Sequence, residues 1–196
     1  ADTIEVGNKG VVQAQANTLS DVSATTVDGS ADANQTLTET KGLDLEVLTV
    51  GNDALKTGSY GILGRTDATL NTTAQSTGDG TAEDANADGQ LNEAFGLELG
   101  DGTDVADTAF TVGDASTIAA IANITNAASA TSVDGNTEAV SKLGADDGTT
   151  SGDAVIGFDL NDAMELGSNS TILAQAIADL DATATTSAGA GGSGTA

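Results

Sequence analysis

Apolar and polar residues alternate over several short stretches of the chain, with the period of two that is typical of a half-buried strand. Ile4 and Val6 alternate with Thr3 and Glu5 near the start, and residues 109–112, with the sequence AFTV, repeat the pattern. Two further strands are predicted, over 43–50 and over 154–160. The pattern therefore predicts a chain that is mainly β.

Two threonine-rich stretches end in the same Asp-Gly dipeptide, at residues 28–29 and 134–135. Asp-Gly favours a tight turn, because aspartate tolerates a left-handed backbone and glycine adopts one without steric cost. Each stretch is predicted to be a strand that closes on such a turn.

Helical spacing of apolar residues is predicted in two places. The first helix follows Asp114 or Ser116, either of which could cap it, and the second follows Ser170. Their apolar faces would hold Ile118, Ile121 and either Ile124 or Thr125 in the first, and Leu173, Ile177 and Leu180 in the second. The predicted fold class is mainly β with a few short helices, as β-sandwich-like or α+β modules.

The chain contains an internal duplication. Residues 14–29 and 120–135 are identical at nine of sixteen aligned positions, and the octapeptides from Asn52 and Asn161 at five of eight. The offset between aligned residues grows only slightly along the chain, so a unit of about 80 residues recurs. We predict a first module at 1–80, an acidic spacer at 81–106, a second module at 107–188 and a Gly/Ala/Ser tail at 189–196.

Composition excludes most catalytic chemistry. The 196 residues include no Cys, His, Trp or Pro. A thiolate nucleophile, an imidazole base and the usual zinc ligands are therefore unavailable. Paired carboxylates such as Asp162 and Glu165 have no recognisable nucleophile or oxyanion site near them in the sequence. We expect no enzymatic activity.

The chain is strongly acidic. Thirty acidic residues oppose five basic ones, which gives a formal charge of −25. Such a surface repels nucleic acid and anionic lipid headgroups, and it favours a salty or cation-rich setting. No apolar run approaches the roughly 20 residues of a membrane span. Neither a nucleic-acid partner nor membrane insertion is predicted.

Residues 108–136 resemble the IN motif of the outer domains of bacterial flagellins and hook-associated proteins. The resemblance is carried by Phe110 and Val112 in a first strand, by Ile118, Ile121 and Ala122 in a helix, and by Ser132, Val133, Asp134 and Gly135 in a second strand. It implies an exposed extracellular structural or decorating module. The long heptad-patterned terminal helices of flagellins have no counterpart, so polymerisation through a terminal coiled coil is not expected.

The spacer carries a calcium-loop pattern, D-x-N-x-D-G-x-L-N. Calcium prefers oxygen ligands at alternate loop positions, with a glycine at the sharp turn, which would be Gly89. The twelfth position, where a bidentate carboxylate belongs, is Phe95. Glu93 or an acid from elsewhere would have to complete the ligand shell. The predicted calcium ligands are Asp84, Asn86, Asp88, Gln90, Asn92 and Glu93.

These observations predict a structural protein that assembles with copies of itself. The strand within residues 1–7 could complete a neighbour's sheet by strand addition, and a lean aliphatic core makes such burial valuable. We expect a subunit of an extracellular bacterial filament or surface layer, located outside the cell or at its surface. The alternatives are a virion protein, such as a phage decoration, tail or fibre subunit, and a calcium-dependent adhesin module.

Overall fold

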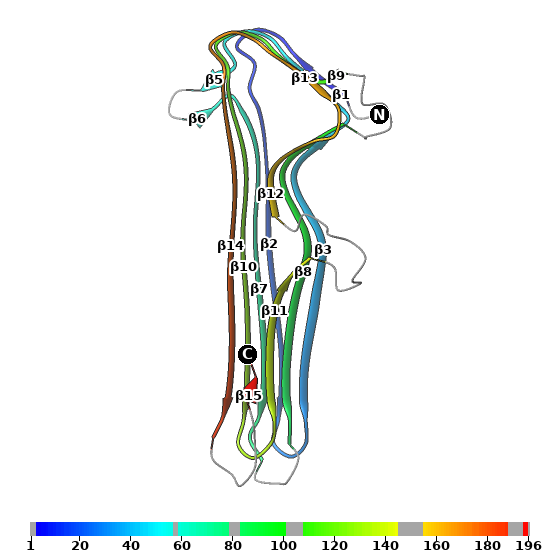
Figure 1. Ribbon diagram of the computed structural model, residues 1–196, viewed down its shortest axis with the longest axis vertical. Helices are drawn as coiled ribbons and strands as arrows, with labels where there is room; N and C mark the ends of the chain where they lie inside the picture. The colour runs from blue at the N-terminus through cyan, green and yellow to red at the C-terminus, as the bar shows by residue number, and fades with distance from the viewer. Residues whose placement is uncertain are drawn as a thin grey trace.

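Four long parallel strands run side by side along the long axis of the molecule in the computed structural model (Figure 1). The structure describes residues 3–56, 59–78, 83–100, 108–144, 155–187 and 194–195. The long sheet consists of these four strands in the order β2 (Val12–Thr26), β7 (Ile62–Ser76), β10 (Thr117–Ser132) and β14 (Thr171–Thr186).

Two further parallel sheets complete the architecture. The opposite sheet, which packs against the long sheet, contains β3 (Ala31–Leu45), β8 (Ala85–Leu99), β11 (Thr137–Leu143), β12 (Val155–Leu160) and β15 (Gly194–Thr195). The short sheet contains β1 (Thr3–Val6), β4 (Val47–Val50), β9 (Thr108–Val112) and β13 (Ala163–Leu166). A small antiparallel hairpin is formed by β5 (Leu55–Lys56) and β6 (Ser59–Tyr60).

The chain visits the short, long and opposite sheets in turn, so it forms a parallel β-solenoid. We name its turns coil 1 (3–45), coil 2 (47–99), coil 3 (108–160) and coil 4 (163–195). The prediction of a mainly β chain is confirmed. The two expected helices are wrong, because their residues lie in β10 and β14. The two facing sheets are successive faces of one solenoid rather than the layers of a sandwich.

The predicted duplication spans two coils at a time. Val12 pairs with Ile62, and Ile62 pairs in turn with Ile118. The separation between Val12 and Ile118 in the sequence equals the offset between the aligned segments 14–29 and 120–135. That offset therefore corresponds to two coils of the solenoid. The segment predicted as a spacer, 81–106, contains β8, which pairs with β3, β11 and β12 in the opposite sheet. Coil 2 therefore belongs to the repeating two-coil unit, and its strand β8 is not part of a separate spacer.

Inward and outward residues alternate along the long strands, as expected for strands with one buried face. At one end of the solenoid cross-section, the core between the long and opposite sheets is built from alanine, including Ala33, Ala87 and Ala130. Small side chains let the two sheets pack closely there. At the other end, where all three sheets meet, larger residues such as Leu48, Ile118 and Phe110 fill the core.

A hydrogen-bonded ladder marks the corner between the short and long sheets. The side chain of Asn8 accepts a bond from the backbone N–H of Asn52 (2.9 Å), and that of Asn52 accepts one from Asp114 (2.9 Å). The Asp114 carboxylate in turn accepts from the N–H of Ser168 (2.6 Å). The next residue at each corner has a left-handed backbone, at Lys9, Asp53, Ala115 and Asn169 (φ between 55° and 61°). The corner is thus the same structure repeated four times.

Candidate functional site

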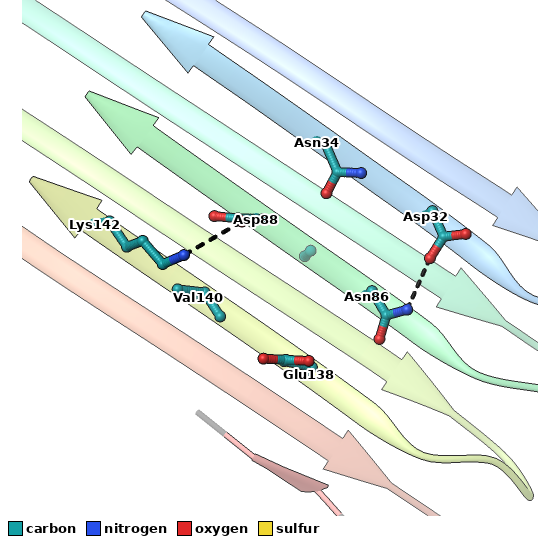
Figure 2. A pocket seen from close by; sticks show the side chains of 8 residues that line it. Asp32, Asn34, Asn86, Asp88, Glu138, Val140 and Lys142 are labelled. Carbon is teal, nitrogen blue, oxygen red and sulfur yellow. Dashed lines mark hydrogen bonds and ion pairs between the residues drawn. The ribbon is translucent and has the colours of Figure 1, made fainter. Parts of the chain in front are cut away.

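The polar outer face of the opposite sheet contains a shallow hollow of about 260 Å³. Three neighbouring strands line it, as Figure 2 shows. Its lining residues are Asp32 and Asn34 on β3, Asn86, Ala87 and Asp88 on β8, and Glu138, Val140 and Lys142 on β11. Three carboxylates and two amides are therefore gathered on successive coils.

The strand register places the hollow's residues in rows. Asp32 pairs with Asn86, and Asn86 with Glu138, while Asp88 of the next row lies beside Asn34. The amide nitrogen Nδ2 of Asn86 donates to Oδ1 of Asp32 at 2.8 Å. Asp88 is separated from Asp32 and from Glu138 by one strand spacing of about 4.8 Å and by about 6.6 Å along the strand, so these carboxylates repel one another unless a cation or a hydrogen-bond donor intervenes.

One lysine offsets part of this negative charge. Nζ of Lys142 lies 3.6 Å from Oδ2 of Asp88 (Figure 2). The two side chains are 35% and 41% exposed, so water screens this pair and it contributes little to stability. Hard oxygen ligands such as carboxylates and amides suit calcium and magnesium. Within the described ranges, no three acidic side chains are close enough together to hold a metal ion as they stand.

The predicted calcium ligands lie along one strand rather than around a loop. Asn86, Asp88, Gln90, Asn92 and Glu93 belong to β8, and Asp84 immediately precedes it. Residues two apart on a strand are separated by about 6.6 Å, so successive side chains do not converge on one point. The structure brings Asn86 and Asp88 together with residues of β3 and β11 instead. Calcium binding itself stays a prediction.

The remaining predicted ligands have separate surroundings. Oδ1 of Asp84 accepts a hydrogen bond from the N–H of Asn136 at 2.8 Å, and Nε2 of Gln90 donates to the carbonyl of Gly144 at 2.9 Å. Oδ1 of Asn92 is buried and has no hydrogen-bond partner among the described atoms. Glu93 pairs in register with Glu39. These four residues do not line the hollow.

Gly89 has a different role from the predicted one. It lies inside β8, where an added Cβ would come within 2.5 Å of Oδ1 of Asn126 and 2.9 Å of Oγ1 of Thr72. The buried Asn126 amide donates to the carbonyls of Gly89 (2.8 Å) and Lys142 (3.1 Å). Gly89 therefore makes room for an interior polar cross-link, and no sharp turn is present.

Sequence reasoning missed the residues that β3 and β11 contribute to the hollow: Asp32, Asn34, Glu138 and Lys142. A usable signal is present. The tetrapeptides ADAN at 31–34, ANAD at 85–88 and TEAV at 137–140 occupy matching positions at the start of three strands. Each places small residues inward and mostly polar residues outward. The second was interpreted alone, as part of a calcium loop.

A second polar cluster lies on the outer face of the long sheet around Asp67. Its carboxylate accepts bonds from Nε and Nη2 of Arg65 (2.6 and 2.9 Å), from Asn123 (2.9 Å) and from Gln15 (2.9 Å). The Arg65 bonds are the largest influence on Asp67. Together with the bonds from Asn123 and Gln15, they lower its pKa, and they outweigh the opposite effect of partial burial.

The Arg65 pair gives a testable pH dependence. Because the pKa of Asp67 is lower in the folded state, the stabilisation is present above the ordinary value of 3.8 and is lost as the pH falls through the folded value. We expect Arg65→Gln to lower the free energy of unfolding by at most about 1 kcal/mol at pH 6, since the pair is partly exposed. The difference in the free energy of unfolding between Arg65→Gln and the unmodified protein should become smaller below about pH 4.

Urea denaturation of both proteins between pH 2.5 and 7 measures this difference. In an Asp67→Asn background, the same Arg65→Gln change should show no such narrowing. A difference that stays constant down to pH 2.5 in the original background would contradict the assignment.

A third charged cluster surrounds Lys41 on the opposite sheet. Nζ of Lys41 lies 2.6 Å from Glu98, 3.0 Å from Glu39 and 3.2 Å from Asp44, and 5.4 Å from the centre of the Phe95 ring. Partial burial lowers the pKa of Lys41, but the hydrogen bonds to Glu98, Glu39 and Asp44 outweigh it, so the net shift is upward. One lysine thus holds together carboxylates of coils 1 and 2.

No protein-family model, curated protein or solved structure matches the chain. The part of the chain that the structure describes contains no helix long and apolar enough to cross a bilayer. The helix implied by the flagellin resemblance is also wrong, because Ile118, Ile121 and Ala122 lie in β10. The functional argument therefore rests on the solenoid itself.

Proposed function

We propose that the protein is a structural subunit that assembles with copies of itself into an extracellular bacterial filament or surface layer. The observation that carries the proposal is the pair of open solenoid ends. β2 and β14 are the outer strands of the long sheet, and within the described ranges neither has a partner on its outer side (Figure 1). They are 15 and 16 residues long.

Long unpaired edges favour association. The backbone groups of an edge strand can pair with another chain, and proteins that must stay monomeric usually blunt such edges. Neither β2 nor β14 contains proline or lysine, two residues that commonly protect edges. The strand within residues 1–7 already pairs with β4 of its own chain. In this proposal β1 therefore stays in the short sheet of its own chain and offers its free edge to a neighbour, instead of being inserted into a neighbour's sheet.

The acidic surface makes assembly depend on cations. The solenoid stacks carboxylates at matching positions, as with Asp44, Glu98 and Asp159 on three successive strands, where Lys41 offsets only part of the negative charge. Like charges about 5 Å apart repel by roughly 1 kcal/mol even in water, and salt screens them. We propose that calcium assists assembly by bridging carboxylates across strands, such as those of Asp32, Asp88 and Glu138. The extracellular setting supplies both salt and calcium.

The test is to follow polymer formation by light scattering and electron microscopy while the salt concentration is raised. We expect little assembly at 10 mM NaCl and elongated or layered polymers at 1 M NaCl or at millimolar CaCl₂. EGTA should reverse the calcium effect, and Asp88→Ala should weaken it. Asp134→Ala is the matched control, since Asp134 is a partly exposed acid of coil 3 that lies outside the hollow and away from both ends of the solenoid.

Two outcomes separate the parts of the proposal. A chain that stays monomeric at high concentration in every salt would refute a self-assembling subunit. Polymers that form equally well in EGTA and in calcium, at the same ionic strength, would refute the proposed role of calcium but not the proposal of self-assembly.

A further inference from the structure

The exposed large apolar side chains of the described residues lie only at the two ends of the solenoid. Three belong to coil 1 and four belong to coil 4, whereas coils 2 and 3 have none. In coil 1 they are Val11, Leu19 and Val27, and in coil 4 they are Met164, Leu166, Ile177 and Leu180. Exposed apolar surface that is confined to particular faces marks an interaction site.

The corner glycine of coil 1 points to a missing neighbour. A Cβ at Gly51 would come within 2.5 Å of the Asn8 side chain of the preceding coil, and a Cβ at Gly113 would collide with Asn52. At the same corner of coil 1, a Cβ at Gly7 would meet nothing within 4 Å. Position 7 therefore has the glycine that a preceding coil would require, although none of the described residues packs against it.

Coil 4, at the other end of the solenoid, has the residues that would fit against coil 1. In the corner ladder, Asn8 lies against Gly51, and Asn52 lies against Gly113. The last member of the ladder is Ser168, so Ser168 of another copy would lie against Gly7 in the same way. The inward apolar rows also continue. Ile4, Leu48, Phe110 and Met164 form one row of the short sheet, and Val6, Val50, Val112 and Leu166 form the next. Met164 and Leu166 would cover Ile4 and Val6.

We propose that coil 4 of one copy stacks on coil 1 of the next in the register of the interior coils, with β13 on β1 and β14 on β2. This inference rests on the proposed function and specifies its contact. Continuing the interior pairing places Asp179 beside Leu19, and Gln175 beside Gln15, of the next copy. The contact joins two different surfaces, and each added copy extends the solenoid along its own axis and not around a ring, so the contact produces an open filament.

The charges at this contact explain why assembly would need salt. The same register places Asp181 beside Asp21 of the next copy. Against this repulsion stand the backbone hydrogen bonds of two strand pairs and the burial of the apolar ends. The opposite sheet contributes less, because β15 is only two residues long.

Disulfide trapping tests the contact, and the chain has no cysteine of its own. Leu19→Cys and Asp179→Cys place single thiols at exposed positions on the two outer strands of the long sheet. In the stacked register their Cα atoms would lie about 4.8 Å apart, within disulfide range, whereas inside one chain they are about 14 Å apart. Gln175→Cys with Leu19→Cys is the matched control, displaced by about 13 Å along the strand.

Equal mixtures of the single variants are oxidised under polymerising conditions and separated on a non-reducing gel. We expect at least tenfold more mixed dimer from Leu19→Cys with Asp179→Cys than from the control pair. Gly7→Ala should also reduce polymer at least tenfold while the melting temperature of the monomer is unchanged.

Each other outcome has a defined meaning. Polymers without the specific cross-link, or with equal cross-linking in both pairs, overturn this contact and leave the proposed function intact. Dimers of Leu19→Cys alone show that identical ends meet, which also overturns it. Absence of polymer from the unmodified chain in every salt refutes the proposed function itself.

Discussion

Phe110→Ala is expected to lower the free energy of unfolding by about 4 kcal/mol, as is typical when a fully buried phenylalanine is truncated. Phe110 has no exposed surface and lies in β9, where the three sheets meet. Its ring packs edge-to-face against Phe158, with the ring centres 5.9 Å apart. Its strand neighbours Leu48 and Met164 belong to the coils on either side. The substitution therefore leaves a cavity that touches three coils.

Urea denaturation at pH 7 in low salt, where the chain is expected to be monomeric, measures this loss. Val27→Ala is the matched control, because Val27 is 67% exposed and its truncation should change stability by less than about 0.5 kcal/mol. A Phe110→Ala loss below about 1 kcal/mol would mean that the core at this junction is not packed as described.

Gly96→Ala should cost about 3 kcal/mol, near the upper end of the usual range for overpacking. An added Cβ at Gly96 would collide with the backbone nitrogen of Ile121 in the facing long sheet, and would lie 2.6 Å from the carbonyl oxygen of Gly157. Backbone atoms cannot rotate away as the end of a flexible side chain can. The two sheets would have to separate at this level to accept one methyl group.

Gly7→Ala is the matched control for this prediction. It makes the same chemical change at a position where a Cβ meets nothing within 4 Å. Thermal melts of dilute protein should show a large fall in melting temperature for Gly96→Ala and almost none for Gly7→Ala. Similar melts for the two variants would show that the long and opposite sheets do not approach closely at Gly96.

The strands with plain alternation could be predicted from the sequence. The strand TIEV at residues 3–6 is predicted because its half-buried Ile4 and Val6 alternate with exposed Thr3 and Glu5. The turn at 28–29 is predicted because Asp-Gly has its own turn chemistry. β10 was mistaken for a helix because apolar residues occur on both of its sides. Ile118 and Ala120 face the core, while Ile121 faces outward with partial burial. Alanine fits either conformation, so composition did not decide the question.

The solenoid itself could not be predicted from a single alignment, because insertions vary the length of the coil. The corner residues Asn8 and Asn52 are 44 positions apart in the chain, whereas Asn52 and Asp114 are 62 positions apart. Only every second coil was similar enough to align. The hollow on the opposite sheet was missed for the same reason, since its rows depend on the register between strands of successive coils.

The parallel register also determines when the fold can begin to form during synthesis. A strand of the long sheet meets the next strand of that sheet only after a whole further coil has been made, so β2 cannot pair with β7 until coil 2 exists. At about 5 to 20 residues per second, the ribosome needs roughly 3 to 10 seconds to supply that partner. Throughout this interval β2 lacks the hydrogen bonds that β7 will supply. The chain has no proline, so no prolyl isomerisation delays the later steps. The acidic residues already made outnumber the basic ones, so nascent chains repel one another during this interval.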